Sequence, residues 1–386
     1  MEMVILSDIH IGRYKYGRMN QYGYDLRTAD ILDNIQQSFD YAEKHGIKTI
    51  HILGDFFHTK RPPHIFRRLL ASKLEWALAK GIKLYLLLGN HDQGKSHAHD
   101  LVEFVELSSQ IENLYVIDTP ISIETEDSIF CFMPHVNIFD MNIENDKFFD
   151  YVIKSVKQLT QEAKDSKKKY KYFFGHYATD KSKAGSGFDM GMDEKCNRVL
   201  PLSIFDESVW TKVYLGDIHK PQELNSFCRH VGSIAKVDFG EEGEVKGFYY
   251  VKDDKDKFIE INDREFKTLS VDLSEDARKQ MTEFCNSVQD LDLSQCIVRL
   301  RVVMKEIDKN LISFTGIEDY LKESCWNYIG KSIQEVREDK EEIKMEHNED
   351  MNYMTLFHSY INQRKVELKE EVIKTGEKVL ADVINS

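Results

Sequence analysis

Five short apolar runs, each ending in residues that can bind metal ions, constrain the fold of this chain more than any other feature. They are MVILSD (3–8), TIHILGD (49–55), KLYLLLGNHD (83–92), YKYFFGH (170–176) and KVYLGDIH (212–219). Runs this short and rich in β-branched and aromatic residues predict buried strands. Amphipathic stretches at 28–45 and 65–80 predict helices that connect parallel strands. With further strands expected at 121–133, 228–233, 247–252 and 257–262, the pattern predicts an α/β fold with two sheets packed between helices.

The polar residues that end these strands should meet at one edge of the structure. Ligands collect at the carboxyl ends of strands in open α/β sheets. Two Asp-x-His pairs place both side chains of each pair on one face of an extended chain. The seven expected ligands are Asp8, His10, Asp55, Asn90, His176, Asp217 and His219. They suffice for two divalent metal ions that share one bridging carboxylate.

A centre of this kind suits the hydrolysis of phosphate esters. Two cations roughly 3.5 to 4 Å apart lower the pKa of a bound water and neutralise charge on the phosphoryl oxygens. Mixed His, Asp and Asn ligands favour Mn²⁺ over Mg²⁺, because Mg²⁺ prefers a shell of oxygen ligands alone. Mg²⁺ is the alternative. A single Asp-x-His is more often a capping residue next to a structural histidine. Five such strand ends in order favour the metal centre.

The order DIH, GDFFH, GNHD, GH, GDIH resembles that of the calcineurin-like metallophosphoesterases. Two stretches are similar to the SbcD-like recombination nucleases within that family, GDFFHTKRPP (54–63) and HVGSIAKVDFGEEGEVKGFYYV (230–251). The resemblance covers most of residues 1–270 and fits a bacterial or a bacteriophage version. It implies a four-layer α/β/β/α sandwich with a small α+β capping domain and C-terminal helices.

The resemblance also implies a role for each site residue. One metal ion would bind Asp8, His10, Asp55 and His219, and the other would bind Asp55, Asn90, His176 and Asp217. His91 matches the residue that protonates the leaving oxygen, with Asp92 expected to orient its ring, and His58 matches the histidine that positions the scissile phosphate. The alternative for His91 and His58 is a structural role.

Position 217 departs from the family pattern. The family usually has Gly-His-x-His where this chain has Gly-Asp-Ile-His at 216–219. We expect Asp217 to remain a ligand and to shift the site toward harder cations, because a carboxylate oxygen is harder than an imidazole nitrogen. The alternative is a weakened second site.

A loop of interleaved basic and aromatic residues, GRYKYGRMNQYGYDLR (12–27), follows the first Asp-x-His. Cations can contact phosphates while aromatic rings stack on bases, so the loop predicts DNA contacts. The candidate DNA-binding residues are Arg13, Lys15, Arg18, Arg61, His64 and Arg67. The alternative is an ordinary solvated loop. The net charge of −14 argues only moderately against a nucleic-acid partner, because the first 100 residues hold more basic than acidic side chains.

Composition divides the chain into four parts. We expect a nuclease domain at 1–265, an α+β DNA-capping domain at 266–334, an acidic linker at 335–350 and two amphipathic helices at 351–386. The helices either dock a partner or pack back on their own protein. The resemblance implies an SbcC-like SMC-type ATPase as that partner, and a homodimer through the helices at 65–80 and 101–107.

The resemblance implies a Mn²⁺-dependent DNA nuclease of recombination, repair or replication, with double-strand exonuclease and single-strand or hairpin endonuclease activity. One alternative is a metallophosphoesterase that acts on a small or non-DNA phosphate substrate, and another is a non-catalytic scaffold for the ATPase. No apolar run reaches the length of a membrane span, and the N-terminus lacks a signal segment, so we expect a cytoplasmic protein. Six cysteines without a CxxC pair predict reduced thiols.

Overall fold

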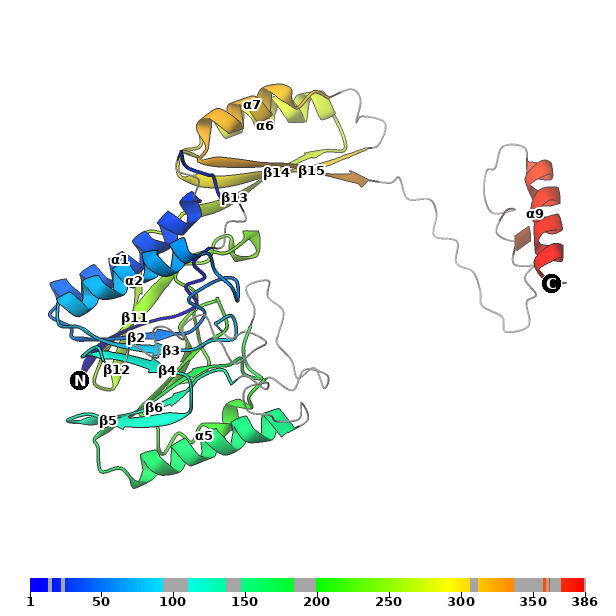
Figure 1. The fold of residues 1–386 in the computed structure, drawn as a ribbon. Helices are drawn as coiled ribbons and strands as arrows, with labels where there is room; N and C mark the ends of the chain where they lie inside the picture. Colours follow the sequence, from blue (N-terminus) through cyan, green and yellow to red (C-terminus); the bar gives the residue numbers. More distant parts are fainter. Residues whose placement is uncertain are drawn as a thin grey trace.

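Two large sheets lie face to face between helices, and a third, smaller sheet stands at one end (Figure 1). The computed structural model describes residues 1–12, 16–21, 25–92, 110–136, 147–183, 199–305, 312–336, 357–358, 361 and 369–384. This arrangement confirms the expected α/β/β/α sandwich with a small additional unit.

The first sheet has the strand order β12-β11-β1-β2-β3-β4. Its parallel strands are β1 (Glu2–Leu6), β2 (Thr49–Leu53), β3 (Lys83–Leu87) and β4 (Leu114–Ile117), and β11 (Gly247–Lys252) and β12 (Lys255–Glu260) extend it antiparallel. Helices α1 (Leu26–Lys44) and α2 (His64–Ala79) pack apolar side chains on its outer face. Asp25 caps α1, because its side chain accepts from the backbone N–H of Thr28.

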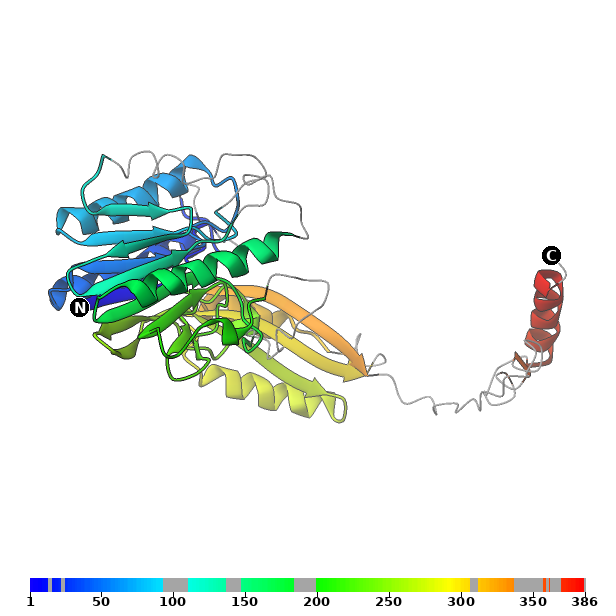
Figure 2. The ribbon, with the colours of Figure 1, turned by 90° about the horizontal axis from the view of Figure 1, so that it is seen from below.

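The second sheet has the order β5-β6-β7-β8-β10-β9. Its strands are β5 (Ile121–Glu124), β6 (Ser128–Met133), β7 (Tyr170–His176), β8 (Lys212–Gly216), β9 (Gln222–Glu223) and β10 (Cys228–His230). Helix α5 (Phe148–Asp165) covers its outer face (Figure 2). The sequence prediction missed α5, although Phe148, Val152, Val156 and Leu159 form a buried stripe at helical spacing.

A layer of buried aromatic side chains joins the two sheets. Phe130, Phe132, Tyr172 and Phe174 from the second sheet are all fully buried in it. Each such side chain contributes about 1.5 to 3 kcal/mol when it leaves water. The layer fixes the sheets against each other, so the carboxyl ends of β1, β2 and β3 lie beside those of β7 and β8.

The third sheet consists of three parallel strands, β13 (Glu265–Leu273), β14 (Cys296–Lys305) and β15 (Asn327–Val336). Helices α6 (Ala277–Gln289) and α7 (Thr315–Ser324) cover one of its faces and enclose a separate core. The chain enters this unit at the expected boundary and stays in β15 two residues beyond 334. The division into domains remains a prediction.

At the C-terminal end, α9 (Lys369–Ile384) lies apart from the sheets in both views (Figures 1 and 2). His358 pairs with Glu377 at 2.7 Å, and the ring of Phe357 lies against Gly376, so parts of the two expected amphipathic stripes contact each other. Tyr353, Leu356 and Tyr360 of the first stripe, and residues 337–350 of the acidic stretch, lie outside the described residues. In the part of the chain that is described, no helix combines the length and the apolar character of a membrane span.

Candidate metal centre

The backbone at the strand ends takes an unusual conformation. Asp8, His10, Asp55 and Asp217 have φ angles of 50°, 53°, 54° and 78°. Residues other than glycine rarely have positive φ, and such residues gather at functional sites. The amide of Asp8 donates to Gly54 O at 3.1 Å and that of His10 to Asp55 O at 2.7 Å, so the loops after β1 and β2 hold each other in place.

Asp55 lies at the middle of the site and is almost completely buried. Its Oδ2 is 3.6 Å from Nε2 of His10, and its Oδ1 is 3.4 Å from Nε2 of His176. The two oxygens of one carboxylate therefore face two different histidines. A carboxylate that bridges two cations needs this arrangement.

On one side of Asp55, the ligand atoms of Asp8, His10 and His219 lie within 4.8 Å of one another. Nε2 of His10 faces Nε2 of His219 at 3.0 Å. Nδ1 of His219 contacts Oε1 of Glu241 at 2.8 Å, so Nδ1 carries the proton and Nε2 presents a lone pair. The Nε2 lone pair of His219, the facing Nε2 of His10 and the Asp8 carboxylate converge, and such a set of groups suits a divalent cation.

On the other side, the ligand atoms of Asp8, Asp55 and His176 form a second group of this size. Nδ1 of His176 donates to Leu53 O at 2.7 Å, which leaves its Nε2 lone pair for the site. Asn90 Oδ1 lies 3.0 Å from that Nε2 and also faces the Asp55 carboxylate. A cation at this place would be bound by these three acceptors, Asn90 Oδ1, His176 Nε2 and the Asp55 carboxylate. Without a cation, a turned amide would place the Asn90 nitrogen 3.2 Å from each Asp55 oxygen.

Asp217 borders this second group. Its Oδ1 is 3.9 Å from Nε2 of His176, and one third of its side chain is exposed. Its backbone N–H donates to Oδ1 of Asp8 at 3.2 Å. The carboxylate thus lies next to the second group without belonging to either tight group, and its role as a ligand stays a prediction.

Electrostatics also suit cations at this centre. Burial alone would raise the pKa of Asp55, but His176 and His10 hold that pKa well below its usual range. Burial lowers the pKa of His176, and Asp55 and Asp8 more than reverse this effect and raise that pKa well above normal. The buried carboxylates at this centre therefore favour positive charge beside them, which a bound metal ion would supply.

The structure corrects the role expected for Asp92. Its oxygens accept from the backbone N–H groups of Asp55 at 2.8 Å, Phe56 at 2.9 Å and Gly89 at 2.8 Å. The side chain is fully buried and ties the loop after β3 to the loop after β2. The ring of His91 is oriented instead by the backbone carbonyl of His58, 2.8 Å from Nδ1.

His91 and His58 lie beside the first group of ligands. The ring of His10 is 5.0 Å from that of His91 and 5.7 Å from that of His58, centre to centre. The Nδ1 proton of His91 faces a carbonyl oxygen, so its Nε2 can carry a second proton toward a substrate. The structure therefore brings both residues to the site, and their chemical roles stay predictions.

Glycines allow the loops to approach this closely. A Cβ at Gly216 would lie 2.5 Å from Oγ of Ser7 and 2.7 Å from Nδ1 of His176. A Cβ at Gly89 would collide with the Asp55 carboxylate and lie 2.9 Å from Cε1 of His176. Both glycines directly precede an expected ligand because any side chain there would push the ligands apart.

Sequence reasoning missed Glu241 and Lys246, which support His219 from outside the ligand set. Burial would raise the pKa of Glu241, but its bonds to His219 and Lys246 lower that pKa to about 2. Lys246 is fully buried, and its Nζ lies 2.8 Å from Oε2 of Glu241. The signal in the sequence was a charged stretch, EEGEVK (241–246), inside an otherwise apolar region.

The candidate DNA-binding residues that the structure describes have different surroundings. Arg13 and Lys15 lie outside the described residues. Arg18 donates to Trp326 O at 2.6 Å, and the ring of Tyr16 packs on Phe239, so this part of the loop holds the third sheet. Arg61 and His64 are exposed and Arg67 is half-buried near the start of α2. Their contact with DNA remains a prediction.

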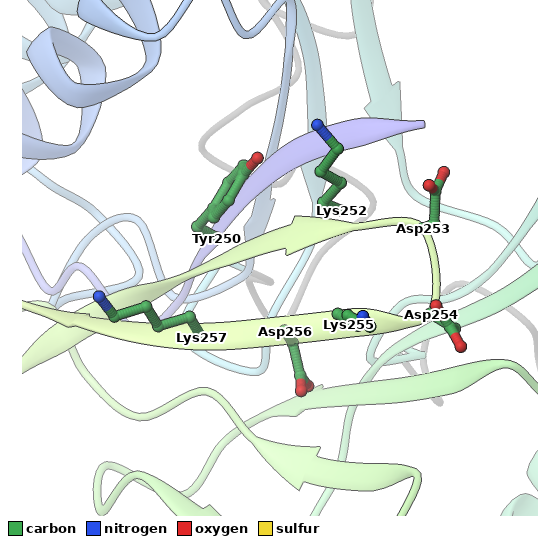
Figure 3. A pocket seen from close by; sticks show the side chains of 7 residues that line it. All are labelled: Tyr250, Lys252, Asp253, Asp254, Lys255, Asp256 and Lys257. Carbon is green, nitrogen blue, oxygen red and sulfur yellow. The ribbon is translucent and has the colours of Figure 1, made fainter.

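Two other charged regions lie away from the centre. Lys167 to Lys169 directly precede β7, whereas His176 ends that strand, so the lysine run lies at the opposite edge. A pocket of about 390 Å³ lies at the β11–β12 hairpin, where Lys252, Asp254, Asp256 and Lys257 point in different directions (Figure 3). Lys252 of this hairpin pairs with Glu2 at the start of β1, far from the ligands that follow the end of β1.

Comparisons with known proteins agree with this geometry. Residues 1–221 match the family described as calcineurin-like phosphoesterase. Exonuclease subunit 1 of Enterobacteria phage T4 is 22% identical over 339 residues, which cover 86% of this chain and 85% of that protein. The SbcD subunit of the nuclease SbcCD from Staphylococcus epidermidis is 25% identical over 258 residues, 64% of this chain and 65% of that protein. A dimetal phosphatase from Danio rerio is 9% identical with a TM-score of 0.37, covering 65% of this chain and 91% of that one, too low a score to support an argument.

Proposed function

Since the chain belongs to the calcineurin-like phosphoesterase family, we propose that it is a nuclease that cuts DNA phosphodiester bonds with two divalent metal ions. The observation that carries this proposal is the carboxylate of Asp55, whose two oxygens face His10 on one side and His176 on the other. The two similar proteins named as nucleases support DNA as the substrate. The mixed nitrogen and oxygen ligands support Mn²⁺ as the preferred ion.

In the proposed hydrolysis, different residues of the chain perform different steps. Asp8, His10 and His219 would hold one metal ion and Asp8, Asp55 and His176 the other, and these ions would supply an activated water and neutralise charge on the phosphoryl oxygens. His91 donates a proton from Nε2 to the leaving oxygen, because its Nδ1 proton is already held by the carbonyl of His58. The His58 side chain, whose ring lies 5.7 Å from those of His10 and His91, positions the scissile phosphate.

The first alternative keeps the centre and changes the substrate to a small phosphate ester. The appended third sheet, with Arg299 and Arg301 exposed on β14, favours a large anionic substrate over a small one. The second alternative is a scaffold without catalysis. The tight ligand groups and the oriented His91 favour an active enzyme.

One assay separates these functions. Linear duplex DNA and bis(p-nitrophenyl) phosphate are incubated with Mn²⁺ and the wild-type protein, Asp55→Asn or Asp150→Asn. Asp150 is an exposed acid in the first turn of α5 that belongs to neither ligand group, and it serves as the matched control. Degradation of DNA that Asp55→Asn abolishes and Asp150→Asn preserves supports the nuclease. Turnover of the small ester alone supports the first alternative, and no turnover of either supports the scaffold.

A double-strand exonuclease and a single-strand or hairpin endonuclease activity belong to the same proposal. DNA labelled at one end distinguishes them, since exonuclease action releases mononucleotides or short products progressively. A dumbbell, a duplex closed by a hairpin loop at each of its two ends, offers no free end and is cut only by endonuclease action. A protein that degrades only substrates with free ends lacks the endonuclease activity.

We further propose that residues 351–386 bind an SbcC-like SMC-type ATPase in DNA recombination, repair or replication. The name of the Staphylococcus epidermidis relative, a subunit of SbcCD, supports a partner of this type. Native mass spectrometry of the ATPase with the full chain and with a chain ending at residue 350 tests it. A truncated chain that still binds the ATPase contradicts the proposal.

A homodimer through the catalytic unit completes the proposed assembly. Helix α2 is one candidate contact, and Ile65 on it is exposed. The second candidate, 101–107, lies outside the described residues. Sedimentation of the full chain and of Ile65→Asp decides, since a dimer through α2 should dissociate when a charge enters its apolar contact.

A further inference from the structure

Glu241 holds the ring of His219 from the side opposite the metal centre. Its Oε1 lies 2.8 Å from Nδ1 of His219, and its Oε2 accepts from the backbone N–H of Val237 at 3.0 Å. The side chain is 7% exposed. A carboxylate in this position fixes the tautomer of a ligand histidine and the direction of its other nitrogen.

Lys246 completes this support. Its buried ammonium contacts three acceptors, Glu241 Oε2 at 2.8 Å, Glu244 Oε2 at 3.0 Å and the backbone oxygen of His219 at 2.9 Å. A lysine has three donors, so each donor is used. Through Glu241 and through the backbone oxygen of His219, Lys246 therefore supports both the ring and the backbone of His219.

The same turn is attached to the third sheet. Glu242, the residue after Glu241, accepts from the backbone N–H of Thr268 on β13 at 2.7 Å and from its hydroxyl. Nε of Arg299 on β14 donates to the same hydroxyl at 2.8 Å. The ring of Phe239 lies edge-on to that of Phe266, 4.9 Å between centres, and the Arg299 guanidinium lies 4.3 Å above the Phe239 ring centre. The carboxylate of Glu241 therefore binds His219, and that of the next residue, Glu242, binds the third sheet.

We propose that the turn η3 (Phe239–Glu241) and Glu242 form a positioning element. Through this element, the position of the third sheet determines how the His219 ring is oriented toward the metal ion. Glu241 and Glu242 are positioning residues, because neither faces the reacting atoms. A ligand that moves the third sheet would change the metal affinity of the first ligand group. The proposal rests on the two-metal centre of the proposed function.

Glu241→Gln tests the first link. One amide oxygen cannot serve both His219 Nδ1 and the donors Val237 N and Lys246 Nζ, and the amide nitrogen repels whichever donor it meets. We expect Mn²⁺ affinity at one of two sites to fall about 10- to 100-fold, the usual effect of losing such a partner. Isothermal titration measures the affinity, and the visible bands of Co²⁺-loaded protein report whether the ligand geometry changes.

Glu244→Gln is the matched control, since Glu244 contacts the same Lys246 but neither His219 nor the third sheet. It should leave affinity and spectrum unchanged. Unchanged Mn²⁺ affinity and Co²⁺ spectrum in Glu241→Gln would overturn the positioning role. Wild-type protein that binds two Mn²⁺ ions and leaves DNA intact would overturn the proposed function alone, whereas wild-type protein that binds none would overturn both.

Thr268→Val tests the second link without touching the turn itself. It removes the hydroxyl between Glu242 and Arg299 and keeps the size of the side chain. We expect a loss of Mn²⁺ affinity of about 2- to 30-fold, the range of coupling through a packed network. The loss should vanish in a Glu241→Gln background, because both changes then act through one path. Additive losses of affinity in the double variant, or no loss in Thr268→Val, would overturn the link to the third sheet. If Glu241→Gln does not fold, the affinity of Thr268→Val alone tests the proposal.

Discussion

The Nε2 atoms of His10 and His219 face each other at 3.0 Å, although 209 positions separate the two histidines in the chain. Two nitrogen lone pairs in contact repel each other unless a proton or a cation lies between them. Glu241 holds the proton of His219 on Nδ1, on the far side of the ring. The folded chain therefore holds the two nitrogen atoms at a separation that either a shared proton or a bound cation stabilises.

Mn²⁺ should consequently stabilise the fold. A ligand that binds only the folded state adds about 2.7 kcal/mol per site at 100 times its Kd. We expect the thermal unfolding transition to rise by several degrees when Mn²⁺ replaces EDTA, and to rise less in His219→Ala. Calorimetry measures the shift. An identical transition with and without Mn²⁺ would contradict the metal centre.

We predict that Asp217 sets the metal preference of the second group of ligands. Its carboxylate lies 3.9 Å from Nε2 of His176 and supplies a hard oxygen and a negative charge. Asp217→Ala should reduce the Mn²⁺ stoichiometry from two toward one and slow DNA cleavage. Asp217→His should keep two ions and lower the activity with Mg²⁺ relative to Mn²⁺. Metal titration of the three proteins decides, and unchanged binding and rate in Asp217→Ala would exclude the ligand role.

His91 should act on the leaving group rather than on metal binding. General acids of this type contribute about 10²- to 10⁴-fold to the rate. His91→Asn should lower kcat for DNA within that range and leave Mn²⁺ affinity nearly unchanged. Turnover of bis(p-nitrophenyl) phosphate should fall much less, because its leaving group needs no proton. Equal losses on both substrates would contradict the acid role.

Sequence could predict which strand ends bring Asp8, His10, Asp55, His176 and His219 together, because each motif is local. An apolar strand followed directly by Asp, Asn or His specifies both the element and the edge at which its side chain lies, as for Asp55 and His176. The βαβ pattern also predicts that β1, β2 and β3 are parallel neighbours, as they are in the first sheet. This part of the site required no knowledge of distant contacts.

The supporting residues could not be located in this way, because their partners are distant in the chain. Asp92 follows His91 directly, yet its carboxylate turns to backbone amides 36 and 37 positions away. Glu241 meets His219 only after β9 and β10 have returned the chain to the site. Tyr16 belongs to a loop whose composition suggested DNA contacts, and it packs on Phe239 beside the third sheet. In each case a tertiary contact selects among several roles that the residue type allows.

A buried histidine between the sheets should make the fold sensitive to acid. His51 on β2 is fully buried, its ring stacks on Phe174 at 4.2 Å, and neither ring nitrogen has a hydrogen-bond partner among the described residues. Burial lowers the pKa of His51 from its ordinary 6.5 to about 3. The unfolded chain therefore takes up a proton as the pH falls below about 6.5, and the folded chain does not until about pH 3.

The contribution of His51 to stability is thus complete above pH 6.5 and is lost progressively as the pH falls toward 3. Each unit of pH in that window costs about 1.4 kcal/mol, so the loss between pH 7 and pH 5 is about 2 kcal/mol. His51→Leu removes this titration, and its urea unfolding in EDTA should lose about 2 kcal/mol less than wild type over the same interval. His45→Leu, at an exposed histidine that follows α1, is the control and should match wild type. Equal losses in wild type and His51→Leu would mean that His51 does not titrate on unfolding in this range.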